Sequence, residues 1–363
     1  MEHNDLHDCM IKVIGVGGAG NNAINRMRKA NVEGCEFISV NTDKLVLKLN
    51  KAHHKIVIGQ QLTRGLGAGA NPEVGQKAAQ ESRSDIEEVL RGTDLLFITC
   101  GMGGGTGTGA APVIASIAKE LGILTVAVVT KPFEFEGAHR ILNAEIGIKN
   151  ISRFVDATIV VPNQKLIENT KQKTTMMEAF SIADDVLRQG IQGLTDLIIT
   201  PMMINLDFAD IATVLRGAGI AHMGVGRARG EGRLLSAIKH AVQSPLLETS
   251  IQGAQKMIVS IKGGRDLDIH EVNNCGNLIR QVVDPGCNMI YGAHIDEAFN
   301  DEVQVIIIAT SFGGKTHYDT PVGTPHPQVI QQEKEVPSLH NNPNVVAPDE
   351  SNLPPYLRRN PNG

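Results

Sequence analysis

Two glycine-rich segments have the residue types of loops that bind phosphate through backbone amides. The first reads GVGGAGNN at residues 15–22, and the second reads GGGTGTG at residues 103–109. Glycine leaves backbone N–H groups uncovered, and amides at the beginning of a helix attract anions. In the second segment Thr106 and Thr108 add hydroxyl groups that can bind a phosphate oxygen or a metal-bound water. Two such loops together predict a site that holds a triphosphate from two sides.

The first loop, taken alone, is also consistent with other interpretations. Gly15, Gly17 and Gly20 match the G-x-G-x-x-G pattern, which indicates an NAD-binding oxidoreductase of the Rossmann type. A tight structural turn between a strand and a helix is a second alternative. A dehydrogenase binds one pyrophosphate and has no need of residues 103–109, so the second loop favours a nucleoside triphosphate.

A third segment, NLDFAD at residues 205–210, brings acidic side chains together. Asp207 and Asp210 are three positions apart and share one face of any helix that begins here. A helix cap explains one of these acids, because a carboxylate at a helix N-terminus accepts hydrogen bonds from free amides. Two acids next to Asn205 also suit a second role, in which the carboxylates polarise an attacking water molecule.

Short apolar runs alternate with helical stretches over the first part of the chain. The predicted strands cover residues 11–16, 37–40, 95–100, 124–130 and 158–161, and the predicted helices cover 21–30, 72–90, 110–121 and 139–150. Continuous β-branched strands separated by helices are typical of a parallel sheet that is covered on both faces. The fold class is therefore α/β, with a doubly wound, mostly parallel sheet.

A long central helix is predicted at residues 175–200, and it is apolar around most of its circumference. Such a helix lies buried between two layers. A helix of about 25 residues spans about 37 Å, so the acidic segment at its far end cannot reach a phosphate bound at the glycine loops of the same chain. If both segments are catalytic, the acids must serve the nucleotide of another molecule.

Composition excludes several classes of protein. The net charge is −5 and aromatic residues make up 3% of the 363 residues, which disfavours a nucleic-acid binder. No apolar run reaches the roughly 18 residues of a membrane span, so no direct membrane insertion is expected. The polar N-terminus does not resemble a secretory signal. The five cysteines lack C-x-x-C spacing and predict buried, reduced thiols in a cytoplasmic protein, with no metal site built by the chain.

Together these motifs resemble the tubulin/FtsZ family of GTPases. The segments that carry the resemblance are residues 15–22, 41–43, 62–72, 101–112 and 205–210. Within the family the pattern is most similar to the FtsZ proteins of bacteria, over about residues 10–312 and again at Leu353–Arg359. Met202 and Met203 depart from the Gly-Leu pair that the family usually has in this loop. The resemblance implies a self-assembling GTPase that polymerises head to tail into protofilaments and forms the division ring at mid-cell.

The resemblance also implies a role for individual residues. The implied GTP- or GDP-binding residues are Gly18, Ala19, Gly20, Asn21 and Asn22 in the first loop, Gly105, Thr106, Gly107 and Thr108 in the second, Glu136 and Arg140 near the ribose and phosphates, and Asn163, Phe180 and Asp184 around guanine. Asp184 is implied as the reader of the base. A carboxylate suits guanine, whose N1–H and 2-amino group are adjacent donors that adenine lacks.

By the same resemblance, Asn205, Asp207 and Asp210 complete the hydrolytic site of the adjacent subunit, and Mg²⁺ accompanies the triphosphate. The terminal peptide Leu353–Arg359 is implied to bind membrane-tethering and regulatory division proteins. A filament protein that does not hydrolyse its nucleotide is the remaining alternative, which a phosphate-release assay distinguishes.

The predicted organisation has six parts. They are an N-terminal extension at 1–10, a GTP-binding domain at 11–174, the central helix at 175–200, a smaller C-terminal α+β domain at 201–313, a disordered linker at 314–350 and a partner-binding peptide at 351–363. Within the α+β domain the predicted helices are 209–215, 233–242 and 271–283, and the predicted strands are 254–261, 288–294 and 303–310. Nine of the 16 prolines lie in the last 50 residues, a composition that buries too little apolar surface to become ordered.

Overall fold

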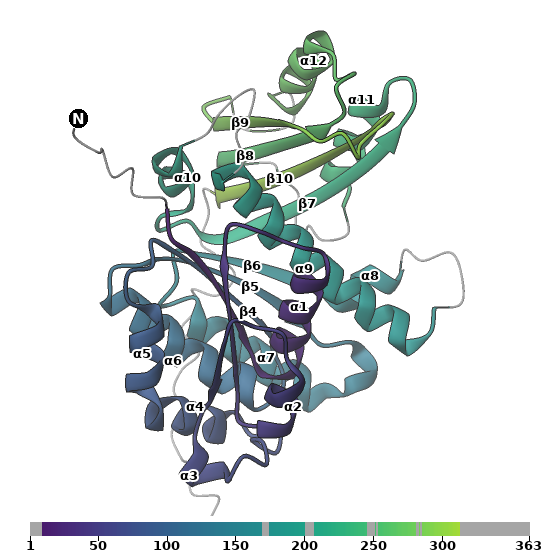
Figure 1. Cartoon of the computed structure of the whole chain (residues 1–363). Coiled ribbons are helices and arrows are strands. Elements are labelled where there is room, and N and C mark those ends of the chain that lie inside the picture. Colours follow the sequence, from purple (N-terminus) through teal and green to yellow (C-terminus); the bar gives the residue numbers. More distant parts are fainter. Residues whose placement is uncertain are drawn as a thin grey trace, which may run out of the picture. The chain divides into compact units, whose positions relative to one another are not determined.

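A ten-stranded sheet forms the centre of the part of the chain that the structure describes (Figure 1). This computed structural model describes residues 9–168, 174–199, 207–244, 251, 253–280, 283 and 285–312. The strands follow one another in the spatial order β3-β2-β1-β4-β5-β6-β7-β10-β8-β9. They are β1 Ile11–Val16, β2 Glu36–Asn41, β3 His54–Val57, β4 Leu95–Gly101, β5 Leu124–Lys131, β6 Ala157–Pro162, β7 Gly219–Arg229, β8 Ala254–Gly263, β9 Asn288–Ile295 and β10 Glu302–Phe312.

The half of the sheet from β3 to β6 is parallel. Strand β1 pairs with both β2 and β4, so Val13 lies opposite Phe37 on one side and Phe97 on the other. Because the chain continues first to one side of β1 and then to the other, the sheet is doubly wound, and a crevice forms at the carboxyl ends of β1 and β4. All five strands predicted for this half are confirmed, with ends that differ by at most one residue.

Strand β7 connects this half to the remaining strands. Gly219–Ala221 pair with β6 in parallel, whereas the rest of β7 pairs with β10 in antiparallel orientation. Strand β8 is antiparallel to β10 and parallel to β9. The three strands and three helices predicted for this region are confirmed apart from shifted ends, but the sequence pattern does not predict β7.

Helices connect and cover the strands. They are α1 Gly17–Lys29, α2 Lys44–Leu49, α3 Gln60–Thr63, α4 Pro72–Glu81, α5 Arg83–Leu90, α6 Thr106–Glu120, α7 Ala138–Ile151, α8 Asn163–Glu168, α9 Met176–Ile199, α10 Phe208–Leu215, α11 Arg233–Val242 and α12 Ile269–Arg280, with a short 3₁₀ helix η1 at Glu134–Glu136.

Three helix predictions need correction. The helix predicted at 72–90 is two helices, because the non-helical backbone of Ser82 interrupts it and the Ser82 hydroxyl accepts a hydrogen bond from the Gly59 amide. The helices predicted to begin at residues 21 and 110 begin at Gly17 and Thr106. In both cases the glycine-rich loop supplies the first turn of the helix. Because glycine has a low helix propensity, the sequence pattern does not reveal this turn.

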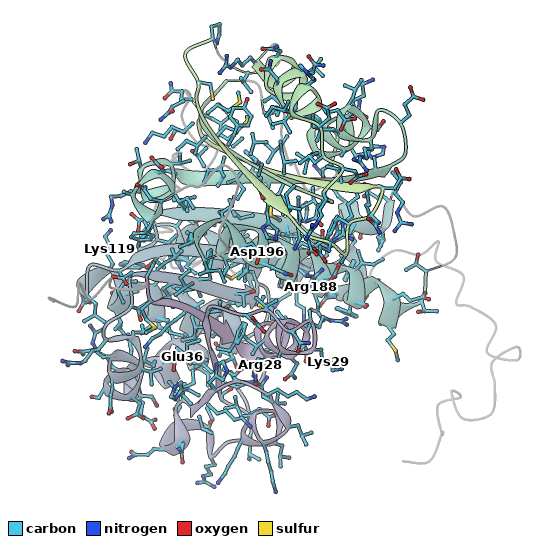
Figure 2. The ribbon with its side chains drawn as sticks, turned by 45° about the horizontal axis from the view of Figure 1, so that its top comes forward. Arg28, Lys29, Glu36, Lys119, Arg188 and Asp196 are labelled. Atoms are coloured by element: carbon cyan, nitrogen blue, oxygen red, sulfur yellow. The ribbon has the colours of Figure 1, made fainter. Side chains whose placement is uncertain are left out.

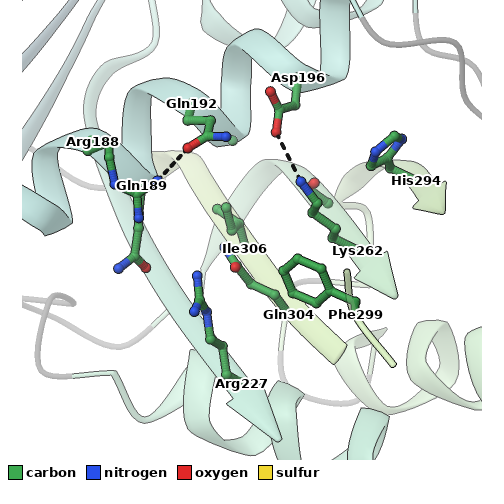
Figure 3. A pocket seen from close by; sticks show the side chains of 12 residues that line it. Arg188, Gln189, Gln192, Asp196, Arg227, Lys262, His294, Phe299, Gln304 and Ile306 are labelled. Atoms are coloured by element: carbon green, nitrogen blue, oxygen red, sulfur yellow. Dashed lines mark hydrogen bonds and ion pairs between the residues drawn. The ribbon is translucent and has the colours of Figure 1, made fainter. Parts of the chain in front are cut away.

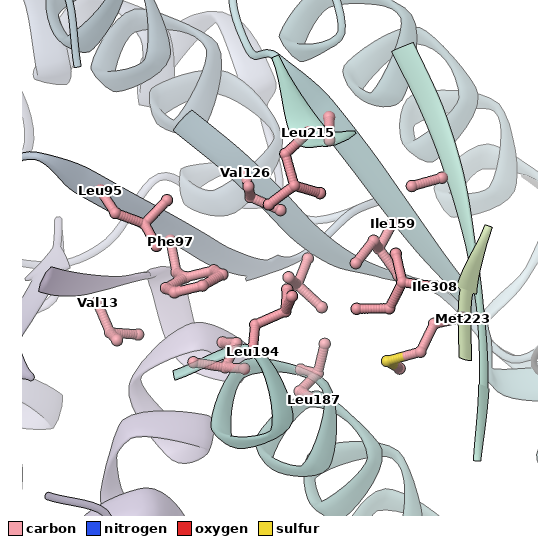
Figure 4. Packing of buried hydrophobic residues seen from close by; sticks show 14 of the residues in the cluster. Val13, Leu95, Phe97, Val126, Ile159, Leu187, Leu194, Leu215, Met223 and Ile308 are labelled. Carbon is pink, nitrogen blue, oxygen red and sulfur yellow. The ribbon is translucent and has the colours of Figure 1, made fainter. Parts of the chain in front are cut away.

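Two hydrophobic layers cover the faces of the parallel half. Val13 and Phe97 belong to the layer that contains the buried residues of α1 and α9, whereas Ile14 and Ile98 belong to the layer formed with α4 to α7. These four side chains are fully buried. Figure 4 shows Val13 and Phe97 on the side of the sheet that faces Leu194 of α9. The buried central helix predicted at 175–200 is therefore confirmed as α9.

The five cysteines are free thiols, as predicted. Cys100 and Cys275 are buried, and burial raises the pKa of each thiol to about 12. Cys9, Cys35 and Cys287 are only partly buried, which corrects the expectation that all five are enclosed.

Several predictions concern residues that the structure does not describe. The segments at 314–350 and 351–363, the peptide Leu353–Arg359, and residues Met202, Met203 and Asn205 lie outside the described ranges. Among the helices that are described, none is long and apolar enough to cross a membrane.

Candidate functional site

A cavity of about 430 Å³ lies at the carboxyl ends of the parallel strands. Val16 at the end of β1, Gly101 at the end of β4 and Thr130 near the end of β5 line it. The predicted site residues that also line it are Gly18, Ala19, Asn22, Gly105, Thr106, Gly107, Glu136, Arg140, Asn163, Phe180 and Asp184. The cavity has the volume of a typical small-molecule site. Eleven of the fourteen predicted ligand-binding residues are thus brought together.

The two glycine loops that line this cavity lead into the N-termini of two helices. Helix α1 begins at Gly17 and α6 begins at Thr106, and neither has a side chain that caps its free amides. The first turn of each helix also lacks an acidic side chain. The uncompensated amides and the positive ends of the two helix dipoles therefore favour a bound anion.

The loops contact each other so closely that side chains are excluded. A Cβ atom on Gly17 would lie 2.9 Å from the Gly107 nitrogen, and Gly17 has a φ of +72°, which other residues rarely adopt. A Cβ atom on Gly107 would lie 2.7 Å from the Gly101 oxygen. The Thr106 and Thr42 hydroxyl groups are hydrogen-bonded at 2.7 Å. This packing holds both sets of amides against one cavity.

Three predicted ligand-binding residues, Gly20, Asn21 and Thr108, do not line the cavity and instead hold the loops in place. The Asn21 amide donates to the Gly15 oxygen at 2.8 Å, and the Thr108 hydroxyl accepts from the Gly103 amide at 2.9 Å. A Cβ atom on Gly20 would lie 2.4 Å from the Thr99 oxygen.

The contrast between Gly18 and Gly20 gives a prediction about stability. Gly20→Ala is expected to lower the free energy of unfolding by about 3 kcal/mol, because the added methyl group meets backbone atoms that cannot move independently. A Cβ atom on Gly18 meets nothing within 4 Å, so Gly18→Ala is expected to stay within about 0.5 kcal/mol of the wild type. Urea denaturation of both variants checks this, and equal midpoints would contradict it.

Glu136 and Arg140 form one wall of the cavity as an ion pair. Arg140 Nη1 donates to Glu136 Oε2 at 2.5 Å, and the other Glu136 oxygen accepts from the Phe133 amide at 3.0 Å. The second contact fixes Glu136 at the end of η1. The guanidinium group adds a positive charge to the cavity, which favours an anionic ligand.

Hydrogen-bond acceptors gather at the other end of the cavity. Asn163 is buried, and its Oδ1 atom has no hydrogen-bond partner among the described residues. The Asp184 carboxylate accepts a hydrogen bond from Arg26 Nε at 2.9 Å. Burial raises the pKa of Asp184, while its contacts with Arg26 act in the opposite direction. Phe180 lies edge-on to Phe133, with ring centroids 5.2 Å apart. This end suits a flat ligand that presents N–H donors.

The acidic residues lie away from the cavity. Asp207 caps α10, and its Oδ1 atom accepts from the Asp210 amide at 2.8 Å. Both residues are exposed, and neither lines the cavity. Figure 1 shows α10 beside the C-terminal end of α9, a helix of 24 residues and thus about 36 Å long. The capping interpretation explains Asp207, whereas no hydrogen bond to the Asp210 carboxylate is found in the described part of the chain.

Sequence reasoning missed some residues that line the cavity. Met102, Thr130, Pro132 and Ala183 are among them. Thr130 is the last residue of a predicted strand and Pro132 follows soon after it, so the rule that ligands bind at the carboxyl ends of strands could have identified both. Ala183 has no such signal, because it is one small residue in a long helix.

A second, smaller cavity of about 150 Å³ lies between α9 and strands β7 to β10 (Figure 3). Lys262 lies 3.7 Å from an oxygen of Asp196 and 2.9 Å from one of Asp296. A nucleotide site needs roughly 300 Å³ or more, so this cavity does not compete with the first.

Comparisons with known proteins agree with this geometry. The GTPase domain of the Tubulin/FtsZ family matches residues 10–171, and the C-terminal domain of the FtsZ family matches residues 219–313. An empty FtsZ dimer from M. jannaschii is 41% identical, with a TM-score of 0.82, and the match covers 85% of this chain and 90% of that one. A mutant of the same FtsZ is 42% identical, with a TM-score of 0.81, covering 84% and 92%.

A GTPγS-bound protofilament of CetZ2 from Haloferax volcanii shares the fold. It is 21% identical, with a TM-score of 0.72, and the match covers 83% of this chain and 93% of that one. The two family domains, the similarity to FtsZ over most of both chains, and the two glycine loops around one cavity lead to the same assignment. The chain belongs to the tubulin/FtsZ family and is an FtsZ-like GTPase.

Proposed function

We propose that this chain binds GTP in the cavity between its glycine loops and hydrolyses it when a second copy stacks on that end. The observation that carries the proposal is the separation of the two sets of residues. The cavity lies at the N-terminal half of α9, whereas Asp207 and Asp210 lie beyond its C-terminal end. One chain cannot bring them together, but a head-to-tail arrangement of two chains can.

Filament formation in relatives supports this arrangement. An FtsZ from M. jannaschii has been solved as a dimer, and CetZ2 from Haloferax volcanii as a protofilament with GTPγS. Repeated head-to-tail contacts produce an open filament when the rotation from one copy to the next does not close into a ring. We infer that this chain forms such protofilaments in the cytoplasm and that they build the division ring at mid-cell.

The triphosphate is held by the N-termini of α1 and α6. Gly18, Ala19 and Asn22 present one group of amides, and Gly105, Thr106 and Gly107 present the other. An NAD-binding oxidoreductase uses one such loop, so the contact between the two loops favours a triphosphate.

The base lies against Phe180 and is read by Asp184. Guanine offers N1–H and an amino group side by side, and one carboxylate can accept from both. The Asn163 oxygen, buried without a partner among the described residues, is a further acceptor at this end. Adenine has no matching pair of donors, so the arrangement selects GTP over ATP.

Mg²⁺ is expected to enter with the triphosphate. Among the described residues, no group of three His, Cys, Asp or Glu side chains is placed to hold a metal ion. The phosphates must therefore supply part of the coordination, and the Thr106 hydroxyl is the protein group at this loop that can hold a metal-bound water. The ion would offset the negative charge of the phosphates.

Hydrolysis needs a water molecule aligned with the terminal phosphate. In the proposed stack the Asp210 carboxylate of one copy polarises this water at the nucleotide of the next, helped by Asp207 and Asn205. Water activation then depends on assembly. The terminal peptide Leu353–Arg359 is proposed to bind membrane-tethering and regulatory division proteins, with no role for nucleic acid or direct membrane insertion.

Hydrolysis across a contact predicts a dependence on protein concentration. Phosphate release per molecule is expected to rise steeply as the concentration passes the onset of assembly, measured beside light scattering with GTP and with GDP. The number of completed sites follows the number of contacts, not the number of chains. A rate per molecule that stays constant across this range contradicts hydrolysis between copies.

A further inference from the structure

We propose that Arg26 is a positioning residue for guanine recognition, because it holds the Asp184 carboxylate in the orientation that the base requires. The inference rests on the proposed function and adds to it a residue that does not line the cavity. Arg26 lies in α1, and Asp184 lies 158 residues later in α9.

The contact between the two residues is direct and directional. Arg26 Nε donates to Asp184 Oδ2 at 2.9 Å. The Asp184 side chain is 12% exposed and that of Arg26 is 37% exposed, so the acid is largely enclosed while the arginine is partly open to solvent. Helices α1 and α9 pack against each other at this point, and both belong to the same buried layer. The carboxylate therefore has little freedom to rotate while the contact persists.

This geometry leaves the other face of the carboxylate available to a ligand. Oδ1 has no partner in the described contacts of Asp184, and Oδ2 retains one lone pair beyond the bond to Arg26. Two adjacent donors on guanine need both oxygens in the plane of the base. A carboxylate free to turn about its Cβ–Cγ bond would lose that alignment.

Charge supports the same role. A carboxylate in a desolvated cavity tends to take up a proton, which removes one acceptor. Burial raises the pKa of Asp184, and the hydrogen bond and charge of Arg26 lower it again. Among the described residues, Arg26 is the charged group whose hydrogen bond and charge act on the Asp184 carboxylate. The two other charged residues that line the cavity, Glu136 and Arg140, pair with each other. Loss of Arg26 therefore removes the hydrogen bond and the charge that lower the pKa of Asp184.

A purely structural role is the competing explanation, because an ion pair between two helices can stabilise the fold without influencing the ligand. The two roles differ in what they do to ITP. Inosine lacks the 2-amino group, so ITP makes one of the two contacts with Asp184 and depends less on its alignment. A structural role affects GTP and ITP equally, whereas a positioning role affects GTP more.

The test compares GTP and ITP binding to full-length wild type, Arg26→Met and Arg28→Met by equilibrium dialysis. Arg28→Met is the matched control, because Arg28, labelled in Figure 2, lies in the same helix. Its guanidinium carbon is 5.9 Å from the centroid of the Phe37 ring, away from Asp184. The wild type and the control are expected to bind GTP at least about tenfold more tightly than ITP, the value of one hydrogen bond to a charged group. Arg26→Met is expected to lose most of this preference through weaker GTP binding.

A pH profile provides a readout that a structural role would not change. Without Arg26 the pKa of Asp184 rises further, so its carboxylate takes up a proton at a higher pH than in the wild type. GTP binding by Arg26→Met is therefore expected to weaken at a higher pH on the acid side. Arg26→Lys, which restores the charge, is expected to recover the wild-type acid limb. Arg26→Gln, which removes the charge but keeps a polar side chain at this partly exposed position, carries the test if Arg26→Met fails to fold.

Three results would overturn this inference or the proposal beneath it. If Arg26→Met keeps the wild-type GTP-to-ITP ratio, or loses GTP and ITP affinity equally, the ion pair is structural only. If its acid limb coincides with that of the wild type, Arg26 does not keep Asp184 ionised. If the wild type does not bind GTP, the proposed function itself fails.

Discussion

Asp210→Asn is expected to lower GTP hydrolysis by at least about a hundredfold, which is the smaller end of what a group acting on the reacting water contributes. GTP binding is expected to remain, because Asp210 does not line the cavity. Filament assembly is expected to remain, because asparagine keeps the size and polarity of this exposed side chain at the contact. Its backbone amide still donates to Asp207, so the cap of α10 is preserved. Phosphate release, GTP binding and light scattering measured on the same preparation check all three parts.

Asp207 allows the chemical role of these acids to be separated from capping. Asparagine caps a helix about as well as aspartate, whereas alanine does not. Under the capping explanation Asp207→Asn hydrolyses GTP normally. Under the catalytic explanation Asp207→Asn is as inactive as Asp207→Ala, but it does not share the loss of stability expected for Asp207→Ala. Asp268→Asn is the control, because Asp268 accepts the His270 amide at 2.7 Å where α12 begins, and it should leave hydrolysis unchanged.

Asp184→Asn is expected to weaken GTP binding by about a hundredfold and to create preferential binding of XTP. The asparagine side chain keeps one acceptor oxygen, but an NH₂ donor replaces the second. This donor faces the amino group of guanine, so both donors are left unpaired in a buried site. Xanthine carries a carbonyl oxygen in place of that amino group and can accept from the new donor. Competition binding with GTP, ATP and XTP measures this change in nucleotide preference.

The Asp184 variant also separates this account from dinucleotide binding. An oxidoreductase that binds NAD at the first loop has no guanine to read, so its ligand affinity would not respond in this pattern. Unchanged GTP affinity in Asp184→Asn, with no gain for XTP, would place the base elsewhere. Asp185→Asn is the neighbouring control, because Asp185 pairs with Arg188 and does not line the cavity.

The parallel strands could be predicted because each is a continuous run of buried β-branched residues. Strand β7 could not, because Gly219, Gly224 and Gly226 dilute its pattern and it depends on pairing with β6 and β10. A Cβ atom on Gly226 would lie 1.9 Å from the Ala237 oxygen. Glycine at this position therefore allows α11 to pack closely against β7. This contact is long-range, and no local sequence pattern reveals it.

The site was predictable to a similar degree. Glycine spacing identified both loops that line the cavity, but not that Asn21 and Thr108 hold the loops instead of lining it. Phe180 and Asp184 have the appearance of ordinary helix residues, and the family resemblance alone identified them. The contact of Asp184 with Arg26 depends on how α1 and α9 pack, so the sequence gives no sign of it.

The central claim is that one copy supplies the nucleotide and the next supplies the acid. Mixing Asp184→Asn with Asp210→Asn in the presence of GTP tests it most directly, because the first variant keeps the acids and the second keeps the nucleotide site. The account predicts phosphate release from the mixture well above the sum of the two variants measured separately. A mixture no more active than that sum would show that hydrolysis is completed within one chain.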